Sequence, residues 1–282
     1  MSTLKPCACA CAEKVGSSSM KPDTCAIVVA GGSGLRFGDP RGKQYVELCG
    51  LPLACWSIIA LDRVAAVGHI VVVCAPEREQ EMRERVLGRV SLRCEVTIAP
   101  AGATRQDSVR SGLTVVPREL DYVAIHDAAR PLIQPEVAKL AIDRVRSDDS
   151  IAGAICAARV TDTLKLVEDS TIVATPERGF YWAAQTPQVF RRVEIAQAHA
   201  VAHRDGYVGT DDASLIERTG GRVVCVASPR DNIKVTLPED LVIARALMER
   251  RLIEGGCGSD FADDSAPGSG GPDVSPGRGS SL

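Results

Sequence analysis

Short apolar runs alternate with amphipathic segments along most of the chain. The runs are apolar throughout rather than at every second position, which is typical of strands buried on both faces of a parallel sheet. We predict strands over residues 25–30, 69–74, 95–99, 122–126, 151–157 and 223–226. Because parallel strands need crossover helices, the pattern predicts an α/β fold with helices on both faces of a mostly parallel, twisted sheet.

The amphipathic segments between these runs predict helices, and several of them begin with proline and carboxylates. Pro76-Glu77, Pro135-Glu136 and Pro238-Glu239 are pairs favoured in the first turn of a helix. We predict helices over residues 53–64, 77–86, 106–115, 135–146, 192–202, 211–219 and 238–251. Ligands of open α/β sheets bind outside the carboxyl ends of the strands, so the loops at those ends are the candidates for a site.

One segment, residues 161–180, breaks the alternation of strands and helices. It holds two short β-like pieces, residues 163–167 and 171–174, on either side of Glu168-Asp169-Ser170. This arrangement predicts a β-hairpin. An isolated hairpin is only marginally stable in water, so we expect it to pack on a further surface, for which a second subunit is one candidate.

Both ends of the chain differ from the segment between them. Residues 1–23 show no hydrophobic periodicity, and residues 254–282 are rich in Gly, Ser, Pro and Asp. Such sequences cannot bury enough apolar area to offset the entropy that is lost on ordering. We therefore predict one folded domain over residues 24–253, flanked by disordered tails.

The 11 cysteines do not indicate a disulfide framework. Cys74, Cys156 and Cys225 lie in apolar, strand-like runs, where a free thiol behaves as a small hydrophobic side chain. The first residues lack the apolar stretch of a secretory signal, so we expect a cytoplasmic protein with reduced thiols. Residues 7–11, CACAC, have a spacing unlike that of zinc hooks. We interpret them as part of a tail, with a soft-metal or redox role left open.

Composition and charge narrow the class of protein further. A chain of 282 residues that is 45% hydrophobic can bury one large core or two small ones, and at 4% aromatic residues that core is mostly Val, Ile, Leu and Ala. The formal net charge of -3 argues against a nucleic-acid-binding protein. The sequence has no uninterrupted apolar run of about 18 residues and predicts no membrane-spanning helix.

A glycine-rich loop, Gly31-Gly32-Ser33-Gly34, follows the first predicted strand, and the cations Arg36 and Lys43 come soon after it. Glycines leave backbone N–H groups accessible to an anion. The loop is not a P-loop, because Phe37 stands at the position of that motif's first glycine. Phe37 also replaces the third glycine of the dinucleotide fingerprint, so hydride chemistry is disfavoured. The two cations favour a phosphate-binding loop over a plain surface turn.

Two further stretches carry charged residues that suit phosphate chemistry. Asp127 ends the fourth predicted strand, where a carboxylate could hold Mg²⁺ on a phosphate, and Arg130 follows three residues later. From these residues alone, an Asp–Arg pair that caps the next helix is an equal alternative, and His126 is interpreted as a structural histidine. Lys234 lies in a short run before the last helix, as an edge charge or as a ligand of an anion. The whole set favours phosphoryl or nucleotidyl transfer.

Several motifs give the chain a likeness to a known family. In order along the chain they are AGGSGLRFG…KQY, HDAARP, TDTLK, QTPQVF, TDDASLIE and DNIKVTLPEDL. Over roughly residues 24–253 the sequence resembles the 2-C-methyl-D-erythritol 4-phosphate cytidylyltransferases. The opening loop is shared by many nucleotidyltransferases, whereas HDAARP together with DNIKVT is much more specific.

The resemblance implies a Rossmann-like nucleotidyltransferase fold and a homodimer joined through a projecting β-arm, here about residues 161–178. It implies that the 4-phosphate of methylerythritol attacks the α-phosphorus of CTP and that pyrophosphate leaves, with Mg²⁺ as cofactor. This reaction is the third step of non-mevalonate isoprenoid synthesis. No protein nucleophile is needed, because the substrate phosphate attacks directly.

The resemblance also implies roles for individual residues. Arg36 and Lys43 are the expected catalytic cations, and Asp127 is the expected ligand of Mg²⁺. The residues expected to bind CTP are Ala30, Gly31, Gly32, Ser33, Gly34, Gly102, Ala103, Ser108 and Ala128. The residues expected to contact the acceptor are Lys234, Arg130, Thr186 and Thr210, with Thr163 and Arg178 contributed by the arm of the other subunit.

Two departures from the family's usual sequence leave alternatives open. The family usually has Ala-Ala-Gly where this chain has Ala30-Gly31-Gly32, and an Ala-Gly-Gly loop also occurs in the related ribitol-5-phosphate cytidylyltransferases. Ala103 stands where the family often has a polar residue. The alternatives are a cytidylyltransferase for ribitol 5-phosphate and a nucleotide-binding regulatory module without turnover. HDAARP argues against the first, and the joint presence of four charged candidate residues argues against the second.

Overall fold

The structure is a computed structural model that describes residues 21–32, 37–39 and 42–254. Its centre is a sheet with the strand order β11-β7-β10-β6-β1-β4-β5. These strands are β1 (Thr24–Val29), β4 (Val67–Cys74), β5 (Glu95–Pro100), β6 (Tyr122–Asp127), β7 (Gly153–Arg159), β10 (Trp182–Arg191) and β11 (Val223–Ala227). Neighbours are parallel except where β10 takes part, which confirms the predicted α/β fold with a mostly parallel sheet.

The register of the central strands brings several loops to one edge of the sheet. β1 lies between β4 and β6, with Val28 opposite both Val72 and His126. Because β1, β4, β5 and β6 are parallel, their carboxyl ends share one edge, which is where ligands of such sheets bind. Gly31 and Gly32 of the glycine-rich loop, the loop after β5 and Asp127 at the end of β6 therefore meet there.

The sequence pattern does not predict β10, which joins the sheet antiparallel to both β6 and β7. Its sequence, WAAQTPQVFR, carries polar residues and a proline in its middle. The register with β7 shifts between Ala184 and Gln188, as expected where a proline interrupts the hydrogen-bond ladder. The strand lacks a continuous apolar run, because its buried residues include Gln185, Thr186 and Gln188.

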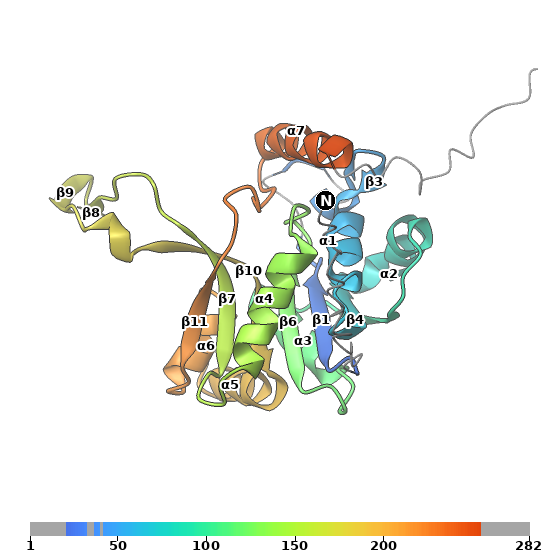
Figure 1. Ribbon diagram of the computed structural model, residues 1–282, viewed down its shortest axis with the longest axis horizontal. Helices are drawn as coiled ribbons and strands as arrows, with labels where there is room; N and C mark the ends of the chain where they lie inside the picture. Colours follow the sequence, from blue (N-terminus) through green and yellow to red (C-terminus); the bar gives the residue numbers. More distant parts are fainter. Residues whose placement is uncertain (1–20, 33–36, 40–41, 255–282) are drawn as a thin grey trace, which may run out of the picture.

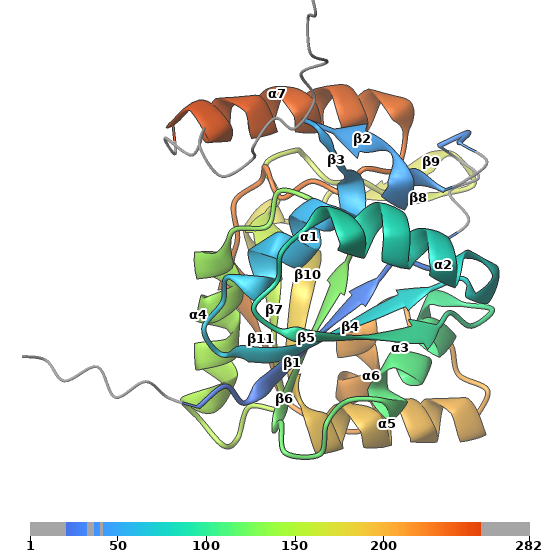
Figure 2. The ribbon, with the colours of Figure 1, turned by 90° about the vertical axis from the view of Figure 1, so that its right-hand side faces the viewer.

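Helices cover both faces of the sheet (Figure 2). On one face lie α1 (Leu53–Asp62) and α4 (Pro135–Arg146), and on the other lie α3 (Arg105–Thr114), α5 (Arg192–Arg204) and α6 (Asp212–Arg218). The side chains of β1 divide in the same way: Ala26 and Val28 belong to the first core, and Cys25 and Ile27 to the second. This is the two-residue period of a strand that lies between two helical layers.

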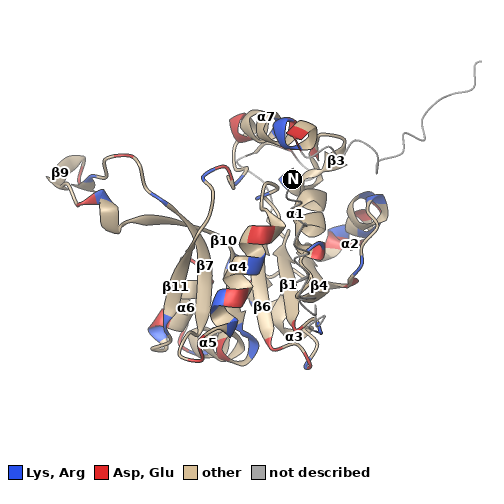
Figure 3. Ribbon diagram, viewed as in Figure 1, with Lys and Arg blue, Asp and Glu red and all other residues tan. Residues whose placement is uncertain are grey.

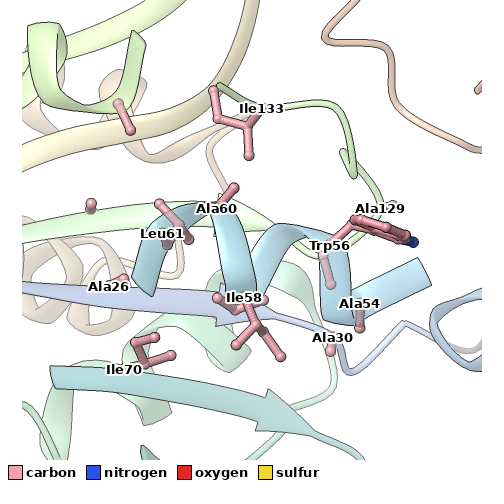
Figure 4. Close-up of a cluster of buried hydrophobic side chains, with 14 of the residues drawn as sticks. Ala26, Ala30, Ala54, Trp56, Ile58, Ala60, Leu61, Ile70, Ala129 and Ile133 are labelled. Carbon is pink, nitrogen blue, oxygen red and sulfur yellow. The ribbon is translucent and has the colours of Figure 1, made fainter. Parts of the chain in front are cut away.

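The helix α1 ties the first core to the carboxyl edge of the sheet. In Figure 4, Ile58 and Leu61 of α1 lie among apolar side chains of the strands, including Ala26 and Ile70. Burying such a side chain fully contributes about 1.5–3 kcal/mol to folding. The hydroxyl of Ser57 lies 3.1 Å from the carbonyl oxygen of Ala128 and can donate to it, so α1 also holds the loop after Asp127.

Several short elements differ from the predictions. Instead of one helix over residues 77–86, the chain forms η2 (Pro76–Arg78), α2 (Glu79–Glu81), η3 (Met82–Val86) and η4 (Leu87–Arg89). Only Met82 and Val86 are buried along this stretch, so little packing holds it in a regular α-helix. The sequence pattern also does not predict η1 (Lys43–Tyr45) or the antiparallel pair of β2 (Glu47–Leu48) and β3 (Leu51–Pro52).

The predicted hairpin is present as an arm that projects from the body of the protein (Figure 1). It consists of β8 (Leu166–Glu168) and β9 (Thr171–Ala174), and every residue of both strands is exposed. A short helix, η5 (Arg178–Phe180), follows, and Phe180 is 81% exposed. Exposed apolar side chains on a thin hairpin favour a partner surface.

Charged residues occur mostly in the helices and loops, and the strands of the sheet contain few of them (Figure 3). The last helix, α7 (Pro238–Glu254), lies beside β2 and β3 (Figures 1 and 2). Within the described ranges, no helix is long and apolar enough to cross a membrane. The cysteines of these ranges have free thiols, and burial raises the pKa of Cys25 and Cys156 to about 12. Both predicted tails, with Cys7, Cys9 and Cys11, fall outside the described residues apart from residues 21–23 and 254.

Candidate active site

A cavity of about 660 Å³ opens at the carboxyl edge of the sheet. This volume is in the range of small-molecule sites, which are about 300–1,000 Å³. The carboxyl ends of β1 and β6, the loops after β1, β5 and β6 and the first turn of α3 supply Val29, Ala30, Gly31, Gly32, Gly102, Ala103, Thr104, Arg105, Ser108, Asp127, Ala128 and Ala129. The remaining lining residues are Phe37, Lys43, Gln44, Lys234 and Thr236. Most of the residues predicted to bind CTP, together with Lys43, Asp127 and Lys234, thus share one cavity.

The loop after β5 is built to present backbone to this cavity. Thr104 caps α3 by accepting a hydrogen bond from the Asp107 N–H at 3.0 Å. The Ser108 hydroxyl donates to the Thr104 carbonyl at 2.9 Å and accepts from the Gly102 N–H at 3.1 Å. A β-carbon on Gly102 would lie 2.4 Å from the β-carbon of Asp107, so only glycine permits this close turn against α3. Ser108 therefore supports the loop in addition to lining the cavity.

Asp127 is a carboxylate that lines the cavity, and cationic side chains surround it. Its Oδ1 accepts from Arg105 Nε at 3.1 Å, and its Oδ2 lies 2.8 Å from Lys234 Nζ. Arg130 is more distant, with its Nε 3.9 Å from Oδ2. Burial raises the pKa of Asp127, but Arg105 and Lys234 more than offset that effect and bring it well below its usual range. Asp127 is therefore ionised at neutral pH, as a metal ligand must be.

Arg105 is the residue that the sequence interpretation missed. It begins α3 directly after Thr104, and its guanidinium bridges Asp127 to Asp212, with Nη1 2.7 Å from Asp212 Oδ2. Burial lowers the pKa of Arg105, but the two carboxylates outweigh that and raise it above its ordinary value. Its position at the first turn of a helix that leaves the carboxyl edge is a signal that could have found it.

A chain of hydrogen bonds fixes Asp127 from beneath. The Asp127 N–H donates to Thr186 Oγ1 at 3.0 Å, and Thr186 Oγ1 lies 3.0 Å from His126 Nδ1. On the other side of the ring, His126 Nε2 faces the Arg130 carbonyl at 3.2 Å and must donate to it. Nδ1 is then the acceptor of the Thr186 hydroxyl proton. His126 is thus a neutral, structural histidine, as the sequence interpretation proposed.

The pH dependence of stability should carry the signature of His126. Burial lowers its pKa to about 4 in the folded protein, against about 6.5 in the unfolded chain. As the pH falls from 6.5 to 4, the unfolded state gains the proton first, so the free energy of unfolding decreases by about 3 kcal/mol in total from this residue. Between pH 7 and pH 5, urea unfolding should show a loss of stability that is about 2 kcal/mol larger in the wild type than in His126→Asn. The exposed His203 supplies the control His203→Asn, and equal losses in all three proteins would contradict this assignment.

Other predicted site residues do not line the cavity. Arg130 is mostly buried, and its Nη1 donates to the Asn232 carbonyl at 2.8 Å. Thr186 is 5% exposed and lies beneath Asp127, and Thr210 is exposed just before α6. Thr163 and Arg178 are exposed on the arm, where Arg178 Nη1 donates to the Thr161 carbonyl at 2.6 Å. Ser33, Gly34 and Arg36 lie outside the described residues.

The residues of the cavity fit a divalent cation bound through phosphate. Mg²⁺ prefers oxygen ligands and commonly takes one or two carboxylates, with waters and substrate phosphates completing its shell. Asp127 supplies one ionised carboxylate that borders the cavity, and it is the residue that would hold the ion. When bound, the ion would neutralise charge on the phosphates.

Fold and site together define a class of protein. A glycine-rich loop at the carboxyl end of the first strand, a carboxylate at the end of β6 and lysines around one cavity are the features of a nucleotidyltransferase. A family model agrees and is more specific. Residues 24–250 match the model described as IspD, 2-C-methyl-D-erythritol 4-phosphate cytidylyltransferase.

Individual relatives of this family cover nearly the same segment. The enzyme of this name from Syntrophotalea carbinolica is 42% identical over 225 residues, which are 79% of this chain and 95% of that protein. The one from Caldanaerobacter subterraneus subsp. tengcongensis is 37% identical over 226 residues, 80% of this chain and 98% of that protein.

Solved structures show the same fold. The 4-diphosphocytidyl-2C-methyl-D-erythritol synthase of Anaerococcus prevotii superimposes with a TM-score of 0.71 at 26% identity, covering 80% of this chain and 96% of that one. The corresponding cytidylyltransferase of Thermus thermophilus has a TM-score of 0.64 at 26% identity, covering 79% and 98%. The chain belongs to the 2-C-methyl-D-erythritol 4-phosphate cytidylyltransferase family, and its fold is the Rossmann-like nucleotidyltransferase fold.

Proposed function

We propose that this chain transfers the cytidylyl group of CTP to 2-C-methyl-D-erythritol 4-phosphate in the non-mevalonate route to isoprenoid precursors. The observation that carries this function is that Asp127, Lys43 and Lys234 share one cavity with Gly31 and Gly32 of the glycine-rich loop, in a chain of this family. The products are 4-diphosphocytidyl-2-C-methyl-D-erythritol and pyrophosphate.

The reaction is a direct displacement at phosphorus. An oxygen of the acceptor phosphate forms a bond to the α-phosphorus of CTP, and the bond from that phosphorus to the oxygen bridging it to the β-phosphorus breaks. Pyrophosphate leaves with the electron pair. Two unit charges 4 Å apart repel by about 4 kcal/mol at an effective dielectric constant of 20, so the approach of two anions needs compensation. The lysines that line the cavity supply fixed positive charge for it.

In our proposal CTP occupies the part of the cavity between the glycine-rich loop and the loop after β5. Lys43, with Arg36, binds the triphosphate and stabilises the charge that grows at the reacting phosphorus. The base lies against the backbone of residues 30–31 and 102–103, near Ser108 and Ala128. Ser33 and Gly34 belong to the same loop. Backbone recognition explains why Ala103, which lacks a polar side chain, is acceptable there.

The glycine at position 31 sets the distance between these two loops. A β-carbon on Gly31 would lie 2.3 Å from the β-carbon of Ala101, so the alanine that the family usually carries does not fit here. Gly31→Ala should therefore separate the loops and raise the KM for CTP about tenfold or more, since overpacking costs about 1–3 kcal/mol. Ala101→Gly removes the obstructing methyl group, so the double variant should recover most of the affinity. Steady-state kinetics of the three variants test this, and an unrescued double variant would contradict it.

The acceptor lies on the Lys234 side of the cavity in our proposal. Lys234 binds its phosphate and Thr210 contacts it, while Arg130, which does not line the cavity, adds positive charge behind the phosphate and Thr186 holds the Asp127 loop beneath it. The exposed arm supports a homodimer in which Thr163 and Arg178 of each arm reach the site of the other subunit. The apolar arm residues Leu166, Val167, Ile172 and Val173 are between 48% and 58% exposed, so about half of the surface of each is open to a partner.

Subunit mixing tests this arrangement. An Arg178→Ala subunit and a Lys43→Ala subunit should each be nearly inactive alone. If Arg178 serves the other subunit's site, a mixed dimer has one site with both defects and one with neither. Activity should then return to about a quarter of the wild-type value, because random exchange makes about half of the dimers mixed and each has one intact site. No recovery, with subunit exchange confirmed by mass spectrometry, would reject the arrangement and leave the reaction assignment standing.

The activity itself is tested by identifying the product. Phosphorus NMR of a mixture with CTP, Mg²⁺ and 2-C-methyl-D-erythritol 4-phosphate should show the acceptor's monoester signal replaced by two coupled diphosphate signals. A monoester signal that persists at high enzyme concentration would contradict the proposed function.

A further inference from the structure

A buried pair lies behind the cavity, where it cannot touch substrate. Asp212 at the start of α6 and His199 of α5 have side chains that are 1% and 0% exposed, and His199 Nε2 lies 3.0 Å from Asp212 Oδ1. Asp212 Oδ2 accepts a hydrogen bond from Arg105 Nη1, and Arg105 Nε donates to Asp127 Oδ1. One guanidinium therefore connects the carboxylate of the cavity with a carboxylate of the core.

Burying this charged pair costs more free energy than a purely structural contact requires. Removing a carboxylate from water costs several kcal/mol, and apolar residues of similar volume often stabilise such a place equally well or better. Burial raises the pKa of Asp212, but Arg105 and His199 outweigh it and lower that pKa below its usual range, so the carboxylate is charged. A charged group that α5 and α6 keep in place suits a role in the charge balance of the site.

The net charge of the groups around Asp127 indicates what that role is. Asp127 and Asp212 carry two negative charges, and Arg105, Lys234 and Arg130, whose Nε lies 3.9 Å from Asp127 Oδ2, carry three positive charges, so the five groups together carry one net positive charge. Without Asp212 the same groups would carry two net positive charges. Arg105 would also be free to turn a second N–H onto Asp127, whose Oδ2 already pairs with Lys234 at 2.8 Å, and the added bond would take up a further lone pair of that carboxylate. Both changes would weaken the hold of Asp127 on a cation.

We propose that Asp212 and His199 are positioning residues that hold Arg105 in a shared, one-bond contact with Asp127 and thereby preserve the affinity of Asp127 for the divalent cation of the nucleotide. This inference rests on the proposed function. In this arrangement a carboxylate–histidine pair acts, through an arginine, on the carboxylate that would hold the metal ion. Changing such an outer partner typically costs 10–100-fold in metal affinity or activity.

The direct test is Asp212→Asn. Asparagine can accept from Arg105 through its oxygen and donate its amide to His199 Nε2, because His199 Nδ1 has no hydrogen-bond partner among the described residues and can take the proton. The variant should therefore fold. Mn²⁺ binding is measured in the presence of CTP and without acceptor, from the electron paramagnetic resonance signal of free Mn²⁺. The affinity for Mn²⁺ should weaken by about tenfold or more. The KM for the acceptor should change less than twofold, a split that general loosening of the site would not produce.

Asp205→Asn is the matched control. It removes a negative charge just after α5, where Asp205 pairs with Arg204 and Arg218 at the surface and contacts neither Arg105 nor His199. Its Mn²⁺ affinity should stay within twofold of the wild type. A folded Asp212→Asn variant with wild-type Mn²⁺ affinity would overturn the proposal.

A second pair of variants keeps the proposal testable if Asp212→Asn does not fold. His199→Gln retains an N–H donor for Asp212, whereas His199→Leu removes it. The proposal expects weaker Mn²⁺ binding in the leucine variant and near-normal binding in the glutamine variant, and equal affinities would overturn it. Product formation by the wild type is measured separately, so a failure of the proposed function is distinguishable from a failure of this inference.

Discussion

Replacing Asp127 with asparagine is expected to lower kcat by about 10²–10³, the size typical for the loss of one preorganised group that stabilises transition-state charge. The substitution removes the ionised carboxylate that borders the cavity and leaves Arg105 and Lys234 without their shared partner. Because Asp127 is mostly buried and its loss leaves two cations without their partner, the melting temperature should also fall, although Arg105 and Lys234 are partly solvated. Turnover must therefore be measured well below the melting temperature of the variant.

The control is Asp143→Asn, at a half-exposed carboxylate of α4 that pairs with Lys139 and Arg146 and does not line the cavity. Its kcat and melting temperature should remain close to those of the wild type, because exposed pairs of this kind contribute about 0.3–0.5 kcal/mol. A folded Asp127→Asn variant with wild-type kcat would show that Asp127 has no catalytic role.

Lys43→Ala is expected to lower turnover by about 10²–10³ and to weaken CTP binding far less. Lys43 lines the cavity at the start of η1, and in our proposal it faces charge that grows only in the transition state. The same split is expected for Arg36→Ala. The measurements are kcat from initial rates and the dissociation constant of CTP from calorimetry.

Lys139→Ala is the control for Lys43→Ala, because Lys139 is an exposed lysine of α4 that does not line the cavity. Its kcat should be unchanged. If Lys43→Ala instead weakens CTP binding and leaves kcat intact, Lys43 serves ground-state binding and has no catalytic role.

The strands of the sheet that are apolar throughout could be predicted because burial on both faces leaves a readable pattern. β1, β4 and β6 fall within one or two residues of the predicted ranges. β10 could not be found in this way, since Gln185 and Gln188 are buried through hydrogen bonds to other segments. Those bonds depend on tertiary structure, which a local pattern does not contain.

The candidate site divides along similar lines. Asp127 and Lys234 are recognisable because each belongs to a distinctive motif, and the structure brings them to 2.8 Å. Arg105 stands in a stretch that the sequence interpretation linked to the base. Its role emerges only when α3 and α6 pack so that it reaches Asp212, 107 positions further along the chain. The pair of Gly31 and Ala101 is likewise visible only once the loops after β1 and β5 are placed side by side.

The most direct test of the account is pyrophosphate release by the purified full chain with each of the four ribonucleoside triphosphates and either of two acceptors. The acceptors are 2-C-methyl-D-erythritol 4-phosphate and ribitol 5-phosphate, each offered with Mg²⁺. We predict rapid release only with CTP and methylerythritol phosphate together. Faster release with ribitol 5-phosphate, or no release with any combination, would contradict the proposed function.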